Sequence, residues 1–315
     1  MSPNDRPATG RLLVLGAGEL GSAMVRALVG SAQRPADVEV SVLLRPSALA
    51  GTDVDKQREI AELRGLGVVI EPGDIAGQSV AELADIFAGF DTVVSWVGFA
   101  AGSGTQLKLA HAALESGVRR YFPWQFGVDY DVIGRGSPQP LFDEQLDVRD
   151  LLRGQDRTEW VIVSTGMFTS FLFEPDFAVV DLAGRRVNAL GGWDTAVTVT
   201  TPDDIGRLTA EIVYRQPAFV NEVVYLAGDT ITYGELASLV EEIVGAPLTR
   251  NLWTVDALLT DLRSDPSDTM KKYRAVFSRG VGVAWDKAQT YNAQHGIDAE
   301  TASDWASRNL NRAAR

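Results

Sequence analysis

The chain has 315 residues, a formal net charge of −13 at pH 7, two histidines and no cysteine. An acidic chain without a basic patch is not expected to bind nucleic acid, and the lack of cysteine excludes disulfides and thiol chemistry. No apolar run reaches the roughly 18–20 residues of a membrane span, and the two histidines lie too far apart for a metal site. We therefore expect a cytoplasmic protein, of about two domains, that has no membrane and no nucleic-acid partner and holds no metal.

Strands and helices alternate along residues 11–166, after a polar segment, 1–10, that we expect to be a flexible lead-in. The expected strands are 11–18, 38–45, 68–75, 91–98, 119–123 and 158–166. Helical spacing of apolar residues predicts helices at 19–30, 56–67, 80–90, 105–118 and 141–154. Short, almost wholly apolar strands are typical of a parallel sheet covered by helices on both faces. The pattern predicts an α/β fold, a doubly wound parallel Rossmann sheet, over residues 11–166.

The pattern changes after the sixth strand. Residues 185–201 read as short strands, helices are expected at 202–216 and 234–245, and the tail mixes short helices with loops. We expect residues 167–315 to form mainly a smaller, interleaved α+β substrate lobe, with about 196–216 returning to the Rossmann domain.

The stretch GAGELG, residues 16–21, has the G-x-G-x-x-G spacing of a dinucleotide-binding turn. It follows an expected strand and opens an expected helix, which is the context that gives the spacing weight. Gly16 allows the tight turn, Gly18 lets the backbone approach a pyrophosphate, and Gly21 lets helix and strand pack closely. Glu19 and Leu20 begin the helix whose free amides would face the phosphates, so we expect them in the cofactor site as well.

The end of the second expected strand bears on the choice of nucleotide. NAD sites commonly carry an acidic residue there, but this chain has Arg45, in the stretch VLLRPS. A guanidinium suits the 2′-phosphate of NADP(H), although a solvated surface arginine is the alternative. We predict that the cofactor is NADPH/NADP.

Two further strand ends are candidates for cofactor contacts. Asp74 and Ile75 follow the third strand, where a side chain can reach the adenine, and Trp96 and Gly98 follow the fourth. Gly98 is expected to approach the cofactor closely, whereas Trp96 could serve the core instead.

The motifs GAGELG, LLRPS, VVIEPGDI, DTVVSWVG, RRYFPWQFGVD and FDEQLDVRDLL occur here in the order found in one enzyme family. Over about residues 11–245 the chain resembles the NmrA-like, isoflavone reductase-like atypical short-chain dehydrogenases. The FPWQFGVDYD form resembles the microbial aromatic alcohol reductase branch. The resemblance implies a Rossmann domain, a substrate lobe and a cleft between them. It also implies NADPH-dependent reduction of isoflavones, lignans or benzylic ethers, by a monomer or homodimer.

The segment YFPWQFGVDYDVIGRG, residues 121–136, carries the family's Phe-Pro-x-x-Phe-Gly loop. The resemblance implies that Phe122, Pro123 and Phe126 line the nicotinamide pocket. Trp124 and Gln125 occupy the variable places of the loop, and we expect them to contact substrate. A rigid aromatic turn with only a packing role is the alternative.

In the plant reductases, a lysine on the next helix acts as general acid or base. Alignment of LFDEQLDVR with that helix puts Gln145 in the place of the lysine. Leu141, Gln145, Val148 and Leu152 share one helical face, so the amide is expected to point inward. An amide does not titrate at ordinary pH, but it can hydrogen-bond the loop, a substrate carbonyl or the nicotinamide amide.

Without the lysine, the proton must come from another group. The candidates are Tyr130, Asp129, water and the phenol of the substrate itself, and Tyr130 is the preferred acid. Asp129 is more typical of a loop-capping residue.

The segment after the sixth strand is rich in aromatic residues. Met167, Phe168 and Phe171 could form a wall for a flat aromatic molecule, or a hydrophobic seam. The leading hypothesis is an NADPH-dependent reductase of a small aromatic metabolite. The alternatives are an NADP(H)-binding redox-sensing regulator, and a non-redox cyclase or isomerase on the same scaffold.

Overall fold

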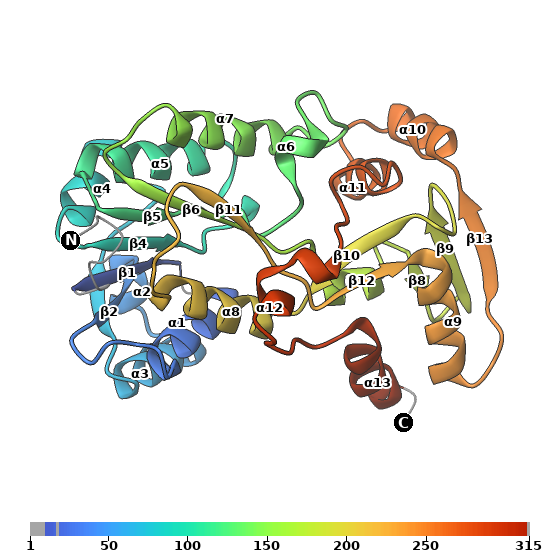
Figure 1. Ribbon diagram of the computed structural model, residues 1–315, viewed down its shortest axis with the longest axis horizontal. Coiled ribbons are helices and arrows are strands. Elements are labelled where there is room, and N and C mark those ends of the chain that lie inside the picture. Colours follow the sequence, from blue (N-terminus) through green and yellow to red (C-terminus); the bar gives the residue numbers. More distant parts are fainter. Residues whose placement is uncertain (1–9, 17–18, 314–315) are drawn as a thin grey trace. The chain divides into compact units, whose positions relative to one another are not determined.

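The computed structural model describes residues 10–16 and 19–313, and Figure 1 labels its elements. The strands are β1 (Arg11–Leu15), β2 (Glu39–Leu44), β3 (Val69–Pro72), β4 (Thr92–Ser95), β5 (Arg120–Phe122), β6 (Glu159–Ser164), β7 (Met167–Phe168), β8 (Val180–Asp181), β9 (Arg186–Leu190), β10 (Ala196–Thr200), β11 (Glu222–Tyr225), β12 (Asp229–Thr232) and β13 (Thr249–Trp253). The α-helices are α1 (Glu19–Gly30), α2 (Pro46–Ala50), α3 (Val54–Gly65), α4 (Val80–Phe87), α5 (Thr105–Ser116), α6 (Tyr130–Ile133), α7 (Leu141–Arg153), α8 (Pro202–Tyr214), α9 (Tyr233–Val244), α10 (Val255–Ser264), α11 (Thr269–Phe277), α12 (Tyr291–Gln294) and α13 (Ala302–Ala313). Short 3₁₀ helices are η2 (Phe99–Ala101), η3 (Thr169–Phe173) and η4 (Lys287–Gln289).

The chain divides into two compact units. The first comprises the chain up to residue 125 with 144–163 and 205–224, and the second comprises 126–143, 164–204 and the chain from 225 onward. The segment that returns to the first unit therefore begins near 205 instead of the expected 196. The reason is that β10, although it precedes this segment directly, pairs with β7 and β12 inside the second unit.

The loop that follows β5 is shared between the units, which the sequence did not reveal. Its first part, up to Gln125, belongs to the first unit, and residues 126–143 belong to the second. Backbone hydrogen bonds explain the second assignment. The Asp129 N–H donates to the Gly282 carbonyl (2.8 Å), and the Gly166 N–H donates to the Gly127 carbonyl (2.9 Å).

The first unit contains a seven-stranded sheet in the order β11-β6-β5-β4-β1-β2-β3. Strands β1 to β6 pair in parallel, in the order of a dinucleotide-binding Rossmann sheet. The predicted fold class is thus confirmed. The edge strand β11 was not predicted, because its few residues carry no clear alternation.

Helices cover the sheet of the first unit on both faces (Figure 1). Helices α4, α5 and α7 bury Phe87, Leu109 and Val148 in one apolar cluster with Leu13 of β1. On the other face α8 packs closely on α1, because a Cβ placed on Gly206 would lie 3.4 Å from the Ala23 carbonyl oxygen.

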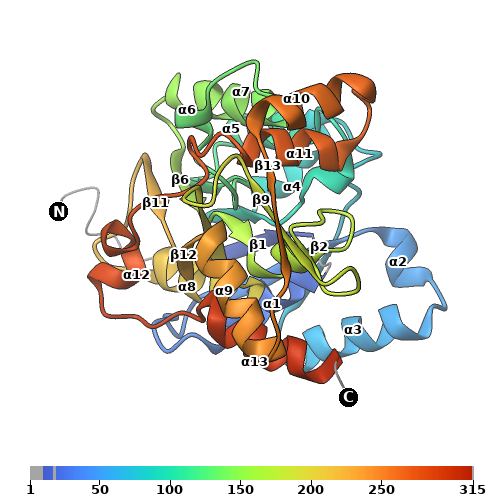
Figure 2. The same cartoon turned by 90° about the vertical axis from the view of Figure 1, so that its right-hand side faces the viewer.

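The second unit contains two three-stranded sheets, β12-β10-β7 and β13-β9-β8. Strand β13 pairs in parallel with β9, and α9 packs against β9 and against the C-terminal helix α13 (Figure 2). Helix α9 begins with a capping box, in which Thr232 accepts from the Glu235 N–H and Glu235 accepts from the Thr232 N–H. Such reciprocal caps are worth about 1 kcal/mol and fix where a helix begins.

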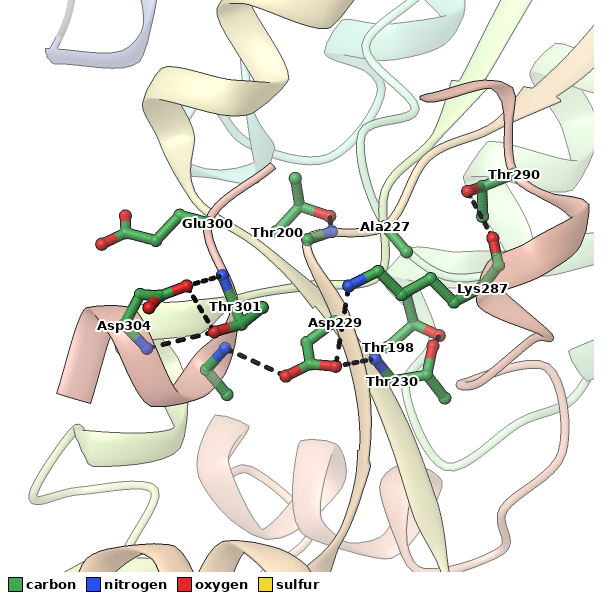
Figure 3. Close-up of polar contacts among 12 residues, drawn as sticks. Thr198, Thr200, Ala227, Asp229, Thr230, Lys287, Thr290, Glu300, Thr301 and Asp304 are labelled. Carbon is green, nitrogen blue, oxygen red and sulfur yellow. Dashed lines mark hydrogen bonds and ion pairs between the residues drawn. The ribbon is translucent and has the colours of Figure 1, made fainter. Parts of the chain in front are cut away.

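Polar contacts attach the C-terminal segment to the second unit (Figure 3). Asp229 accepts from the Ala302 N–H (3.1 Å) at the start of α13, and its other oxygen lies 4.0 Å from the Lys287 ammonium. Thr301 and Asp304 exchange hydrogen bonds in the first turn of the same helix. Trp305, one residue further on, stacks on Phe173 with ring centroids 4.8 Å apart. The tail is therefore an integral part of this unit.

We predict a loss of stability above pH 10 that originates in buried tyrosines. Burial raises the pKa of Tyr214 to about 12, and burial also raises the pKa of Tyr233. The unfolded chain releases these protons near pH 10 and the folded chain does not. The contribution of these tyrosines to the free energy of unfolding is therefore complete below pH 10 and is lost as pH rises further. Each tyrosine contributes a slope of about 1.4 kcal/mol per pH unit in that window. Urea unfolding from pH 8 to 11 measures the slope, and Tyr214→Phe should lessen it. An unchanged slope would contradict the assignment.

Candidate nucleotide-binding and active site

A cavity of about 580 Å³ opens in the first unit where the parallel strands β1 to β4 end. Ligands of open α/β sheets bind at this edge. The lining residues are Gly16, Leu43, Leu44, Arg45, Ala48, Lys56, Gly73, Asp74, Ile75, Ala76, Trp96, Val97, Gly98, Ala101 and Thr105. Six predicted cofactor residues, Gly16, Arg45, Asp74, Ile75, Trp96 and Gly98, thus come together around one cavity.

The glycine-rich turn has geometry that only glycine tolerates. Gly16 has φ +91°, and a Cβ at Gly21 would lie 2.3 Å from the Gly16 carbonyl oxygen. The start of α1 therefore packs directly on the end of β1. Gly18 lies outside the described residues, and so do the side chains of Glu19 and Leu20, so their predicted contacts stay predictions.

Arg45 follows β2 and lies at the N-cap of α2, with its side chain exposed. Among the described residues it forms no side-chain hydrogen bond or ion pair, so its charge is available to a ligand. Lys56, also on the cavity wall, pairs with Glu59 at 2.7 Å. Arg45 is thus better placed than Lys56 to meet an anionic group of a ligand.

The loop after β3 is held by its own polar contacts. Asp74 accepts from the Ala76 N–H (3.1 Å), and its N–H donates to the side chain of Gln78 (2.7 Å). Lys108 of α5 donates to the Ile75 carbonyl at 2.8 Å. Lys108 is a residue that sequence reasoning missed, since the contact spans 33 positions. It fixes the cavity wall next to Ile75.

The loop after β5 touches the loop after β4. Trp124 meets Phe99 edge to face, with ring centroids 4.5 Å apart and an interplanar angle of 73°. A Cβ placed on Gly98 would lie 3.3 Å from the Trp124 indole. Gln106 donates to the Val97 carbonyl at 2.6 Å and supports the same wall. Trp124 therefore contacts a backbone segment that lines the cavity.

A buried polar chain connects this loop to α7. Gln125, Gln145 and Arg149 are each 0% exposed. The Arg149 Nε donates to the Gln125 side-chain oxygen (2.7 Å), and the Gln125 amide nitrogen donates to the Gln145 backbone carbonyl (2.9 Å). The side-chain nitrogen and oxygen of Gln145 have no hydrogen-bond partner among the residues that the structure describes. The inward direction that the helical stripe predicts for Gln145 agrees with this burial.

Glu144, next to Gln145, was also missed from the sequence. Its carboxylate accepts from the N–H groups of Gly104 and Gln106, both at 2.9 Å, at the N-terminus of α5. The N-cap residue of α5 is Gly104, which has no side chain to do this. A carboxylate from another helix thus completes the first turn beside the cavity.

The remaining loop residues are buried. Phe122 and Pro123 lie in the first unit and Phe126 in the second, and none of the three lines the described cavity. Their predicted contacts with the cofactor stay predictions. Asp129 accepts from the N–H groups of Asp131 and Val132 as the N-cap of α6, and from the Tyr225 hydroxyl (2.7 Å). The capping role expected for Asp129 agrees with this geometry.

The second unit holds the predicted acid and the predicted substrate wall. Tyr130 is buried and meets Phe142 edge to face at 5.0 Å, and Phe142 lies 6.2 Å from Tyr273. Phe171 lies 5.8 Å from Tyr273, so these rings form one aromatic cluster. Burial raises the pKa of Tyr273 to about 12.

Met167 and Phe168, the other predicted wall residues, belong to β7. Met167 is buried and pairs with Val199 of β10, while Phe168 is half-buried.

Within the described ranges, none of the helices combines the length and apolar character that a bilayer span requires. Nor, in that part of the chain, do three or more histidine, aspartate or glutamate side chains gather in a way that would hold a metal ion.

Comparisons with known proteins agree with this architecture. The NmrA-like family profile matches residues 8–278. An NmrA-like family domain-containing oxidoreductase of Gibberella moniliformis is 50% identical over 91% of this chain and 93% of its own. The phenylcoumaran benzylic ether reductase Betv6 of Betula pendula is 26% identical over 81% of each chain. The solved leucoanthocyanidin reductase–NADPH complex of Vitis vinifera has the same fold, with a TM-score of 0.77 at 22% identity, over 95% of this chain and 99% of that one. The chain belongs to the NmrA-like family.

Proposed function

We propose that this protein is an NADPH-dependent oxidoreductase that reduces a small aromatic substrate by hydride transfer. The observation that carries the proposal is the cavity at the ends of β1 to β4, which Gly16 of the glycine-rich turn and the exposed Arg45 both line. The turn suits a pyrophosphate and the guanidinium suits a 2′-phosphate, so the residues present fit NADPH.

The names of the relatives support a reductase with an aromatic substrate. The 50% identical relative is called an oxidoreductase, and the Betula protein a phenylcoumaran benzylic ether reductase. In the aromatic cluster, Phe142 is buried, and the half-buried rings of Phe171 and Tyr273 are of the kind that stack on aromatic ligands.

Bound NADPH would supply the hydride, and this chain supplies positioning and a proton. Arg45 and the start of α1 would hold the phosphates. Gln145 cannot donate a proton, because an amide does not titrate. We assign the donor role to the Tyr130 hydroxyl, the preferred acid from the sequence.

Replacement of Tyr130 by phenylalanine is therefore expected to lower kcat while KM and the affinity for NADPH stay unchanged. The reason is that the phenol would act on the reaction and not on binding. Steady-state kinetics over a range of pH measure this effect. Tyr233→Phe removes the hydroxyl of another buried tyrosine of the second unit and should leave kcat unchanged. An equal effect of both changes would point to packing instead of catalysis.

A second function, a regulator that binds NADP(H) without turning it over, is favoured by one observation. The residue at the family's lysine position, Gln145, cannot titrate. A regulator would be expected to distinguish NADPH from NADP⁺ strongly in binding and to show no turnover.

Calorimetric titration with NADPH, NADP⁺, NADH and NAD⁺ tests both functions, followed by a turnover screen of aromatic ketones, enones and benzylic ethers. The expected result is preference for the phosphorylated pair and oxidation of NADPH by at least one of these classes. If none of the four nucleotides binds, the proposal is wrong.

A further inference from the structure

The side-chain amide of Gln145 is one of the buried polar groups of the first unit that lack a hydrogen-bond partner within the described residues. It is fully buried, and within the described part of the chain neither its nitrogen nor its oxygen has a hydrogen-bond partner. Native proteins rarely leave both ends of a buried amide unpaired, because the desolvation of each end is then uncompensated. An unpaired buried amide of this kind indicates that a bound ligand supplies the missing hydrogen bonds.

The surroundings of Gln145 hold its backbone while leaving its amide uncommitted. The Gln125 amide nitrogen donates to the Gln145 carbonyl, and Arg149 in turn fixes Gln125. Gln145 and Arg149 are one turn apart on the same face of α7.

The same loop connects Gln145 to the nucleotide cavity. Trp124 directly precedes Gln125 and contacts Gly98, which lines the cavity at the end of β4. Arg45, the candidate for the 2′-phosphate, lies at the end of β2 instead. In the sheet, β1 lies between β4 and β2, so this loop reaches the cavity on the side away from Arg45.

We propose that the Gln145 amide binds the carboxamide of the cofactor's nicotinamide ring, with Gln125 and Arg149 as positioning residues. A carboxamide offers one acceptor and an NH₂ donor, which complement the acceptor and donor of a glutamine. This role deepens the proposed function and rests on it. It gives position 145 a binding task in place of the proton transfer that a lysine would perform.

The test compares NADPH with adenosine 2′,5′-bisphosphate, which lacks the nicotinamide, by calorimetry. In Gln145→Met, NADPH should bind about tenfold more weakly, the value of one or two lost hydrogen bonds, and the bisphosphate should bind as in the wild type. Without ligand, Gln145→Met should melt at a higher temperature, because an apolar side chain replaces an unpaired amide. Gln139→Met is the matched control, since Gln139 is a buried glutamine of the second unit whose amide nitrogen also lacks a partner among the described residues.

Three results would overturn the inference. If NADPH affinity is unchanged while KM for an aromatic substrate rises, the amide serves the substrate. If neither the NADPH affinity nor the KM for the substrate changes, the amide contacts no ligand and serves only packing. If both nucleotides weaken equally, the change has distorted the whole cavity. Gln145→Leu repeats the comparison should Gln145→Met not fold. A wild type that binds neither nucleotide would instead remove the proposed function.

Discussion

Gly21→Val is expected to weaken NADPH binding by about 100-fold or more. A Cβ at this position would lie 2.3 Å from the carbonyl oxygen of Gly16 and 2.9 Å from its carbonyl carbon, and ordinary contacts require more than 3.4 Å. Both atoms are backbone, in a turn where Gly16 has φ +91°, so neither can rotate away. The start of α1 would have to move away from the end of β1 and so withdraw its N–H groups from the phosphates. The loss of one or two hydrogen bonds to a charged group, about 1.5–3 kcal/mol each, weakens binding roughly 100-fold.

Calorimetric titration with NADPH measures the loss, and thermal unfolding shows whether the variant is folded. Gly30→Ala is the control, because Gly30 ends the same helix and a Cβ there meets nothing within 4 Å. It should bind NADPH as the wild type does. Unchanged affinity in Gly21→Val would show that the phosphates do not lie at this turn.

Arg45→Glu is expected to reverse the preference between NADPH and NADH, with a change in the affinity ratio on the order of 100-fold. The loss of charge-assisted hydrogen bonds to a 2′-phosphate costs about 1.5–3 kcal/mol, and the new carboxylate repels the phosphate as well. The carboxylate can accept from the free 2′-hydroxyl of NADH, as the acidic residue of NAD sites does. Arg45 has no partner among the described residues, so the change should leave the stability of the protein nearly intact.

The two nucleotides are compared by their calorimetric affinities for the same variant. Arg64→Glu makes the same change of charge on the exposed surface of α3, outside the cavity wall, and should leave the ratio unaltered. If both variants shift the ratio alike, the overall charge of the chain and not a specific contact sets the preference. If neither does, the 2′-phosphate is bound elsewhere.

The residue at position 145 would affect hydride transfer through the cofactor. Hydride transfer depends above all on the orientation of the nicotinamide against the substrate, and hydrogen bonds to the ring carboxamide would set that orientation. A neutral amide at 145 together with the Tyr130 phenol would separate the tasks of binding and proton donation. The Gln145→Met and Tyr130→Phe variants should therefore fail in different ways, the first in affinity for NADPH and the second in kcat.

The nucleotide site could be predicted from the sequence because its signals are local. The turn at Gly16–Gly21 and the arginine after β2 each lie within a few residues of a strand end. The carboxyl ends of parallel strands meet at one edge of the sheet, so local motifs that follow strands gather there without further information. The alternation of apolar strands and amphipathic helices determined the Rossmann sheet in the same way.

Only the tertiary structure decided how distant residues meet at the candidate site. Glu144 caps α5 from 40 positions away at Gly104, and Arg149 fixes Gln125 across 24 positions. The same packing divides the loop after β5 between the two units at Gln125 and leaves the Gln145 amide buried, with no partner in the described ranges 10–16 and 19–313. No periodic pattern in the sequence predicts these contacts, because each depends on which helix faces pack together and on the side chains that fill the space between them. The helical stripe that includes Gln145 showed that the amide points inward, and only the packing around it decided that the amide has no partner.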